Sequence, residues 1–247
     1  MAQPIAGILL DLGETVLTFG KVDVPALFEE GSRMAYDHLS RQGRKLPPFR
    51  RYHWAKLLAI RWAYIRSRAT DREFDAVDLL RRLHRRLGID LSPEGALELA
   101  GMWYAPLSRL AVVEKGTAEV LAGFRARGLT VGVVSNTFIP ASILDAHLRR
   151  EGLIDLLPIR VYSCEVTWRK PHRRIFEAAL ARGRLEAART LFVGDSMLAD
   201  IRGANRAGLI SVLKDPLGRK RCWPFRPRHR IRRLDEIQRI VEEYDTD

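Results

Sequence analysis

Five short apolar runs place the strongest constraint on how this chain can fold. They are continuous rather than alternating, which is typical of strands in a parallel sheet that helices cover on both faces. The runs are IAGILL (5–10), LTVGVV (129–134), IRVYS (159–163), TLFV (190–193) and LISVL (209–213). Helical patterns accompany the later runs, at 116–127, 172–182 and 200–207. Strands and helices in alternation predict an α/β fold with a doubly wound parallel sheet.

A long helical block interrupts this alternation between the first run and the second. Residues 20–111 show no clear strand pattern. Their helical patterns lie at 25–42, 50–68, 73–87 and 93–104. A connection of about 90 residues with no structure of its own would be unusual in a compact domain. The sequence therefore predicts a core domain formed by residues 1–19 and 112–247, with an inserted α-helical domain at 20–111.

Polar and charged residues follow the apolar runs where four of the predicted strands end. In a parallel sheet these carboxyl ends meet at one edge, and ligands bind there. The residues are Asp11 after the first run, Ser135 and Asn136 after the second, Lys170 a few residues beyond the third, and Asp195 and Asp200 after the fourth. One aspartate at a strand end is usually a turn residue, but four such positions in order indicate a shared site.

Phosphoryl transfer is the chemistry that suits this set of side chains. Asp11 can attack phosphorus and form an aspartyl-phosphate, which splits one difficult step into two easier ones. Asp11, Asp195 and Asp200 supply the hard oxygen ligands that Mg²⁺ prefers. Lys170 can hold a phosphoryl oxygen as a point charge. Ser135 and neighbouring N–H groups can bind the other phosphoryl oxygens.

Four motifs, in this order, resemble those of the haloacid dehalogenase-like (HAD) hydrolase superfamily, in the branch with a helical C1-type cap. The motifs are LLDLGETVL (9–17), VVSNT (133–137), EVTWRKPHRRIF (165–176) and VGDSMLADIRGANRAG (193–208). The resemblance covers nearly the whole chain, and its fourth motif is the most specific. It implies a Rossmann-like core, a Mg²⁺ cofactor and, for most members, phosphatase activity on small phosphate esters.

The resemblance also implies individual roles. Asp11 is the nucleophile and a metal ligand, and Asp195 is a second metal ligand. Asp200 is a supporting ligand or orients Lys170, which takes part in catalysis. The candidate phosphate-binding residues are Ser135, Asn136 and Lys170.

The first motif departs from the family pattern at one position. The usual motif is Asp-x-Asp, whose second aspartate protonates the leaving oxygen and then activates water. This chain has Gly13 there, and by resemblance its carbonyl can still bind Mg²⁺. General acid/base catalysis contributes typically about 10²–10⁴-fold, so its loss can leave real activity with good leaving groups. Glu14 is the candidate substitute acid/base; alternatively it is a turn residue or the partner of an arginine in the helical insertion.

Three functions remain open at this point. A Mg²⁺-dependent phosphatase agrees with most of the motifs. A non-catalytic module that binds Mg²⁺ and phosphate on the same fold would explain Gly13. A 2-haloacid dehalogenase agrees least, because that chemistry uses the same aspartate without metal. Members with it resemble Asp-x-Tyr at the first motif and lack the aspartate pair that stands here at 195 and 200.

Charge and composition indicate the partners and the compartment. The net charge of +12 is concentrated in two segments: 41–86, with 14 Lys and Arg against 4 Asp and Glu, and 219–233, with 8 against none. Either these segments are solvated helix faces, or their positive field attracts an anionic partner; in the second case a small phosphorylated substrate is the hypothesis. Nucleic acid is less favoured, because no RNA- or DNA-reading motif is present. Two cysteines, no apolar run of membrane-spanning length and no basic secretory start predict a cytoplasmic protein without a membrane contact. The oligomeric state is not predicted.

Overall fold

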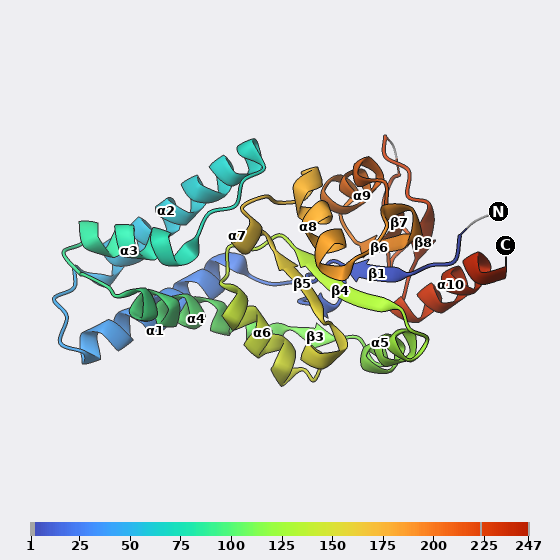
Figure 1. The fold of residues 1–247 in the computed structure, drawn as a ribbon. Helices are drawn as coiled ribbons and strands as arrows, with labels where there is room; N and C mark the ends of the chain where they lie inside the picture. Colours follow the sequence, from blue (N-terminus) through green and yellow to red (C-terminus); the bar gives the residue numbers. More distant parts are fainter. Residues whose placement is uncertain (1–2, 223, 247) are drawn as a thin grey trace.

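Six parallel strands form the central sheet of the computed structural model, which describes residues 3–222 and 224–246 (Figure 1). Their order across the sheet is β5-β4-β1-β6-β7-β8. The strands are β1 (Gly7–Leu10), β4 (Thr130–Ser135), β5 (Ile159–Tyr162), β6 (Thr190–Gly194), β7 (Ile210–Lys214) and β8 (His229–Ile231). The predicted α/β class is confirmed, and each of the five apolar runs contains most of one strand.

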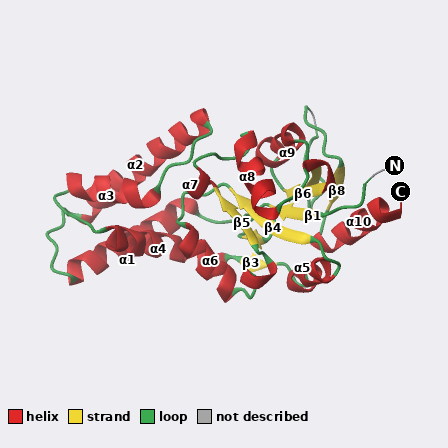
Figure 2. Ribbon diagram, in the orientation of Figure 1, coloured by secondary structure: helices red, strands yellow, loops and turns green. Residues whose placement is uncertain are grey.

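Helices cover both faces of the sheet, as Figure 2 shows. One face carries α8 (Arg173–Gly183) and α9 (Arg202–Ala207); the other carries α5 (Thr117–Ala126), α6 (Ala141–Arg150) and α10 (Ile237–Thr246). Leu9 of β1 belongs to the core under α8 and α9, whereas Ile8 and Leu10 belong to the core under the opposite helices. Because both faces of β1 are buried, its sequence is apolar at every position rather than at every second one.

Helix α6 has no counterpart in the sequence analysis. It begins after Pro140 without a side-chain cap, and polar residues interrupt its sequence, ASILDAHLRR. Its buried Leu144 and Leu148 are one helical turn apart and pack into the core on that face of the sheet. This spacing is the signal that could have revealed the helix. A one-turn helix, α7 (Ser163–Val166), was not predicted either.

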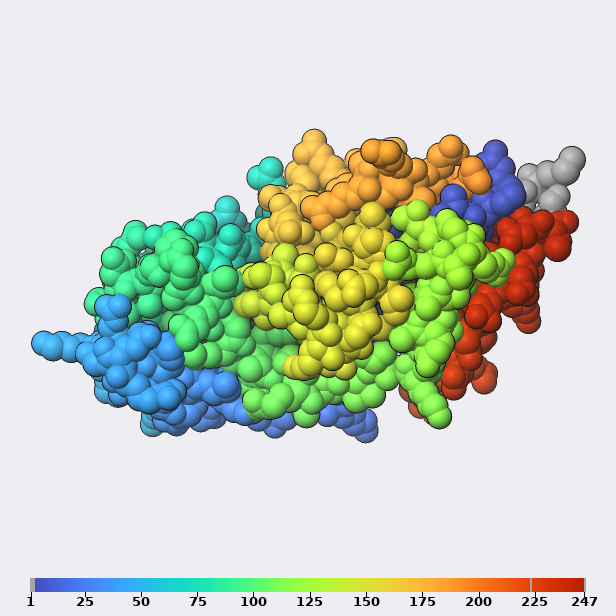
Figure 3. All heavy atoms as spheres, turned by 60° about the horizontal axis from the view of Figure 1, so that its bottom comes forward, coloured from blue at the N-terminus to red at the C-terminus, as the bar shows by residue number. Residues whose placement is uncertain are grey.

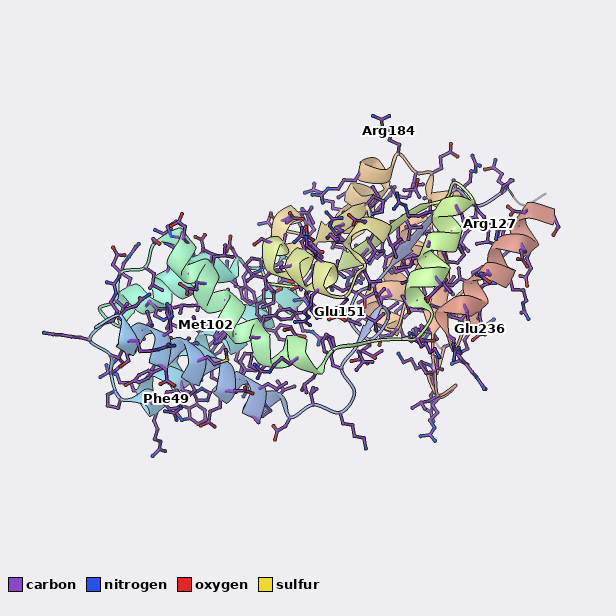
Figure 4. The ribbon with its side chains drawn as sticks, turned by 90° about the horizontal axis from the view of Figure 1, so that it is seen from below. Phe49, Met102, Arg127, Glu151, Arg184 and Glu236 are labelled. Atoms are coloured by element: carbon purple, nitrogen blue, oxygen red, sulfur yellow. The ribbon has the colours of Figure 1, made fainter. Side chains whose placement is uncertain are left out.

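Residues 24–110 form four helices that we call the helical lobe. They are α1 (Val24–Arg41), α2 (Phe49–Thr70), α3 (Ala76–Arg86) and α4 (Pro93–Leu110). The side chains of Asp23, Asp75 and Ser92 accept hydrogen bonds from first-turn N–H groups of α1, α3 and α4, as N-cap residues do. Figure 4 shows the lobe on the side away from α5 and α10, with Phe49 and Met102 on its helices.

The helical lobe has a hydrophobic core of its own, distinct from the two cores that flank the sheet. Its buried side chains include Leu39, Tyr52, Leu80, Leu99 and Trp103. All four helices expected in this region are present, and the division into two domains at these boundaries stays a prediction. Within the described parts of the chain, no helix combines the length and the apolar character needed to cross a membrane.

Two chain crossings join the helical lobe to the sheet, and they lie side by side. β2 (Leu17–Thr18) leaves for the lobe and pairs antiparallel with β3 (Val112–Val113), which returns from it. At the end of β7, the buried ammonium of Lys214 donates to the carbonyl of Thr15 at 2.8 Å and to the carboxylate of Glu114 at 2.9 Å. One side chain of the sheet therefore fastens both crossings.

Substitutions at two glycines compare how tightly the sheet and a surface helix are packed. A Cβ at Gly132 in β4 would lie 2.5 Å from the Cβ and the carbonyl oxygen of Ile159 in β5, whereas one at Gly123 in α5 would meet nothing within 4 Å. We expect Gly132→Ala to lower the free energy of unfolding by about 1–3 kcal/mol through overpacking. Gly123→Ala should raise it by about 0.5–1 kcal/mol, because alanine loses less backbone entropy in a helix. Denaturant unfolding measures both, and equal effects would contradict the packing described here.

Candidate active site

The register of the sheet brings the carboxyl ends of three strands together. Leu10 of β1 pairs with Val133 of β4 on one side and with Val193 of β6 on the other. The N–H of Asp11 still donates to the carbonyl of Val193, at 2.8 Å. Chain order runs outward from β1 in both directions, so the connections that follow these strands diverge at this edge of the sheet, the place where open α/β sheets form their ligand crevice. Asp11 stands at that position.

Four of the residues predicted for the site meet there. Carboxylate oxygens of Asp11, Asp195 and Asp200 lie within 4.8 Å of one another. The ammonium nitrogen of Lys170 lies 2.5 Å from Asp11 Oδ1 and 2.7 Å from Asp200 Oδ1. Lys170 and Asp200 are almost fully buried, whereas Asp195 is partly exposed. The predicted convergence of these side chains is therefore what the structure contains.

A π-helical turn, Met197–Ile201, holds Asp200 in the cluster. The N–H of Ser196 donates to Asp200 Oδ2 at 2.8 Å, and the Ser196 hydroxyl accepts from the N–H of Ala199 at 3.1 Å. A Cβ at Gly194 would overlap the Asp200 carboxyl group, so only glycine leaves room for it at the end of β6. Turns of this kind are rare and occur frequently at functional sites.

Asn136 fixes the backbone of Lys170. Its side-chain oxygen accepts from the N–H of Lys170 at 2.6 Å, and its side-chain nitrogen donates to the Lys170 carbonyl at 2.8 Å. The polar atoms of the Asn136 side chain are thus engaged in positioning Lys170, and the contact with phosphate suggested by the sequence stays a prediction. Ser135 lies at the carboxyl end of β4 and is mostly buried, and its hydroxyl has no hydrogen bond to the described residues.

The cluster holds more negative than positive charge, and burial disfavours the charged forms of its side chains. Burial raises the pKa of Asp11 to about 7; Lys170 opposes this shift, and Asp200 and Asp195 add to it. Burial also disfavours the ammonium of Lys170, but Asp11 and Asp200 outweigh it and raise the pKa of Lys170. Lys170 therefore stays charged. Three carboxylates whose oxygens lie within 4.8 Å of one another form a donor set that suits a divalent cation with oxygen ligands.

Gly13 and Glu14 lie in the turn that follows Asp11. Glu14 has a left-handed backbone (φ 57°), and its exposed side chain accepts from the N–H of Phe19 at 3.1 Å. This is the arrangement expected of a turn residue, and it engages one oxygen of the carboxylate suggested as the substitute acid/base. Gly13 has an ordinary backbone conformation, and a Cβ there would come no nearer than 3.8 Å to the ring of Phe19.

A carboxylate from the helical lobe, Glu73, reaches the loops of the site and was not foreseen from the sequence. Its side chain is 1% exposed and lies 3.6 Å from the guanidinium of Arg169. It accepts from the hydroxyls of Ser67 at 3.0 Å and Ser163 at 2.9 Å. Ser163 in turn accepts from the N–H of Thr137 at 2.8 Å. Glu73 therefore links the lobe to the loops that carry Ser135 and Lys170.

The backbone reinforces this link. Segment 71–73 pairs with segment 167–169: the N–H of Arg169 donates to Asp71 at 3.0 Å, and the N–H of Glu73 donates to Thr167 at 2.7 Å. The ring of Phe74 stacks on that of Phe138, with 4.9 Å between centroids. Figure 3 shows the lobe in contact with this yellow part of the chain. These contacts form only when segments distant in the sequence dock, so no local sequence pattern predicts them.

Lys220, in the basic segment 219–233, is a second residue that the sequence did not assign to the site. Its ammonium lies 3.0 Å from Asp195 Oδ2 and also contacts the Asp195 carbonyl. Asp215, after β7, accepts from the N–H of Lys220 at 2.9 Å and from Arg230 at 2.7 Å, which holds this loop against the site. One part of the basic segment thus has a local structural role.

Comparison with known proteins identifies the class. The family model described as haloacid dehalogenase-like hydrolase matches residues 5–208, and the chain belongs to this family. The predicted resemblance is confirmed. One relative, the ribulose-1,5-bisphosphate 5-phosphatase of Halopiger xanaduensis, is 34% identical over 50% of this chain and 51% of its own length. The phosphoserine phosphatase of Thermus thermophilus is 32% identical over 50% of this chain and 49% of its own. The chain thus matches about half the length of these relatives.

Solved structures of the same fold cover almost the whole chain. A 2-haloacid dehalogenase from Pseudomonas syringae pv. Tomato DC3000 matches with a TM-score of 0.69 at 20% identity, over 97% of this chain and 99% of its own. The HAD-hydrolase YfnB from Bacillus subtilis, bound to magnesium, matches with a TM-score of 0.61 at 20% identity, over 97% and 99%. At this identity the similarity establishes the fold alone, and the Rossmann-like α/β class is confirmed.

The crowded carboxylates predict a gain in stability when Asp11 is neutralised. The pKa of Asp11 is raised to about 7 from 3.8, so the folded state binds more protons than the unfolded state in this interval and loses stability as the pH rises through it. In EDTA at pH 8, we expect Asp11→Asn to raise the unfolding temperature. The gain should shrink as the pH falls from about 7 towards 3.8.

Asp145 provides the control for this prediction. Its carboxylate is well satisfied, because it accepts from Arg160 at 3.0 Å and from the hydroxyl of Tyr162 at 2.8 Å. Asp145→Asn should lower the unfolding temperature at pH 8. A decrease for Asp11→Asn under the same conditions would show that the ion pair with Lys170 outweighs the burial of the carboxylate.

Proposed function

We propose that this protein is a Mg²⁺-dependent phosphatase that hydrolyses a small phosphate ester through an aspartyl-phosphate on Asp11. The observation that carries the proposal is the meeting of Asp11, Lys170, Asp195 and Asp200 at one edge of the sheet. Family membership supports a hydrolase. The phosphatase names of relatives matched over half their length support the finer assignment to phosphate esters.

In the proposed first step, a carboxylate oxygen of Asp11 attacks phosphorus while the bond from phosphorus to the ester oxygen breaks. The departing oxygen takes its proton from solvent. In the second step water attacks phosphorus, the bond to Asp11 breaks, and phosphate leaves with the carboxylate restored. Lys170 orients Asp11 and binds a phosphoryl oxygen, and the hydroxyl of Ser135 binds another. Asn136 contributes by fixing the backbone of Lys170.

The carboxylates of Asp11, Asp195 and Asp200 and the carbonyl of Gly13 would hold Mg²⁺. When bound, the cation neutralises charge on the phosphate and on the carboxylates. A cation would also favour the ionised form of Asp11, which burial alone disfavours. The solved structure of YfnB with magnesium agrees with this cofactor.

We further propose that residues 20–111 act as a cap over the crevice. Two crossings fastened by Lys214 connect this region to the sheet, and Glu73 reaches from it to the loops of the site. A cap of this kind excludes water and shapes substrate selectivity. A small anionic substrate suits a site enclosed in this way, whereas a nucleic acid would need an open surface.

An activated aryl phosphate tests the proposed activity. We expect phosphate release in the presence of Mg²⁺, loss of that release in EDTA, and a decrease of at least about 10³-fold in Asp11→Asn, which removes the nucleophile. Asp90→Asn, which changes an exposed carboxylate between α3 and α4, is the matched control and should keep its activity. Chloride release from 2-chloropropionate without metal would indicate a dehalogenase. Inactivity in both assays would favour the non-catalytic module.

Restoring the missing aspartate tests the role of the first motif. The space at Gly13 accepts a side chain, so Gly13→Asp should raise the hydrolysis rate of alkyl phosphates, whose leaving groups need a proton, by up to about 10²–10⁴-fold. The rate with an activated aryl phosphate should change much less. Gly13→Asn has nearly the same size without the acid and should give no gain. Glu14→Ala should leave both rates unchanged. Equal effects of Asp and Asn at position 13 would contradict this account.

A further inference from the structure

A cavity of about 540 Å³ opens in the helical lobe, between α2, α3 and the segment that joins them. In Figure 1 these two helices form the upper part of the lobe. None of the catalytic candidates Asp11, Lys170 or Asp195 lines this cavity, so it is distinct from the crevice at the sheet edge. Its volume falls in the range of sites that hold small ligands, about 300–1,000 Å³.

Four arginines line this cavity, which we call the arginine-lined cavity. They are Arg66 on α2, Arg72 in the joining segment, and Arg82 and Arg86 on α3. Among these guanidinium groups only that of Arg82 has a carboxylate partner in the described chain, Asp78 at 3.9 Å, and both side chains of that pair are 59% exposed. An exposed pair of this kind is weak. The guanidinium of Arg72 also lies over the ring of Trp168, 4.9 Å from its centroid. A concave surface bordered by arginines favours an anionic ligand.

The acidic residue of the lining does not neutralise these arginines. Glu73 accepts hydrogen bonds from Ser67 and Ser163 and faces Arg169, and its side chain is 1% exposed. Its charge is therefore committed to the link with the site loops. The cavity keeps a net positive charge toward any ligand that enters it.

Apart from Ser67 and Thr70, the remaining lining is apolar, and it includes an aromatic ring that little else covers. The side chains of Ala59, Ala63, Leu79 and Leu83 contribute small or aliphatic surface. Trp62 also belongs to the lining, yet it is 70% exposed. An exposed indole beside arginines offers a planar surface on which an aromatic ring can stack, and stacking of a nucleobase on an aromatic side chain is worth about 1–3 kcal/mol.

We propose that the arginine-lined cavity binds a nucleoside di- or triphosphate. The arginines would hold the phosphate groups, because the planar guanidinium donates two parallel hydrogen bonds to phosphate oxygens. Trp62 would stack on the base. This combination selects against inorganic phosphates, which lack the planar part, and against apolar ligands, which lack the charge. The proposal concerns a site separate from Asp11 and does not depend on phosphatase activity.

Titration calorimetry with ADP in EDTA tests this site in the 247-residue chain. The test variant is the double substitution Arg82→Gln/Arg86→Gln, and the matched control is Arg61→Gln/Arg85→Gln. The control removes two exposed arginines from the same helices, α2 and α3, that lie outside the lining. We expect the test variant to bind ADP at least about tenfold more weakly, since charge-assisted hydrogen bonds are lost, and the control to stay within about threefold of the unchanged protein.

Two further measurements distinguish binding in this cavity from binding in the catalytic crevice and from attraction by charge alone. Trp62→Ala should weaken ADP binding at least about fivefold but leave tripolyphosphate binding unchanged, since only the base uses the ring. Binding of ADP should persist in Asp11→Asn, which changes the catalytic crevice but not this cavity. Absence of ADP binding at millimolar concentration, equal loss in test and control variants, tripolyphosphate binding as tight as that of ADP, or loss of binding in Asp11→Asn would each overturn the proposal.

Discussion

The ammonium of Lys170, held between Asp11 and Asp200, is the interaction on which the rest of the structure depends. Its partners stand at the ends of two neighbouring strands, and Lys170 itself arrives from the loop that follows a third. A buried charge is costly unless it is paired with good geometry. The sheet register, the two hydrogen bonds between Asn136 and the Lys170 backbone and the close approach of Asp200 to Gly194 all serve that geometry.

The same cluster contributes less to stability than its ion pairs suggest. Asp11 and Asp200 share the buried ammonium of Lys170, and Asp195 lies beside them. Burial raises the pKa of Asp11, and the neighbouring carboxylates add to that shift. Perturbed groups of this kind gather at functional sites, where the protein gives up stability for chemistry. A divalent cation would balance the excess of negative charge.

The sequence predicts which side chains meet at the sheet edge, because parallel strands end at the same edge whatever side chains they carry. Asp11 and Asp195 could be placed from that rule alone. This rule does not predict the contacts of Glu73 or Lys220, which form only when segments distant in the sequence dock. Even Asn136, correctly placed at a strand end, has a partner that local sequence does not reveal. Helix α6 was not predicted because polar residues interrupt its apolar ones.

The helical lobe is hydrogen-bonded to the segment that directly precedes Lys170. Segment 71–73 of the lobe pairs with segment 167–169, and Lys170 is the next residue. The lobe is therefore connected to the sheet domain through this pairing as well as through its two crossings. Two main-chain hydrogen bonds between these segments hold the lobe beside the backbone that carries the ammonium. The arginine-lined cavity borders the same segment through Arg72 and Glu73. The lining of the cavity and the backbone of Lys170 thus meet at one pair of hydrogen-bonded segments.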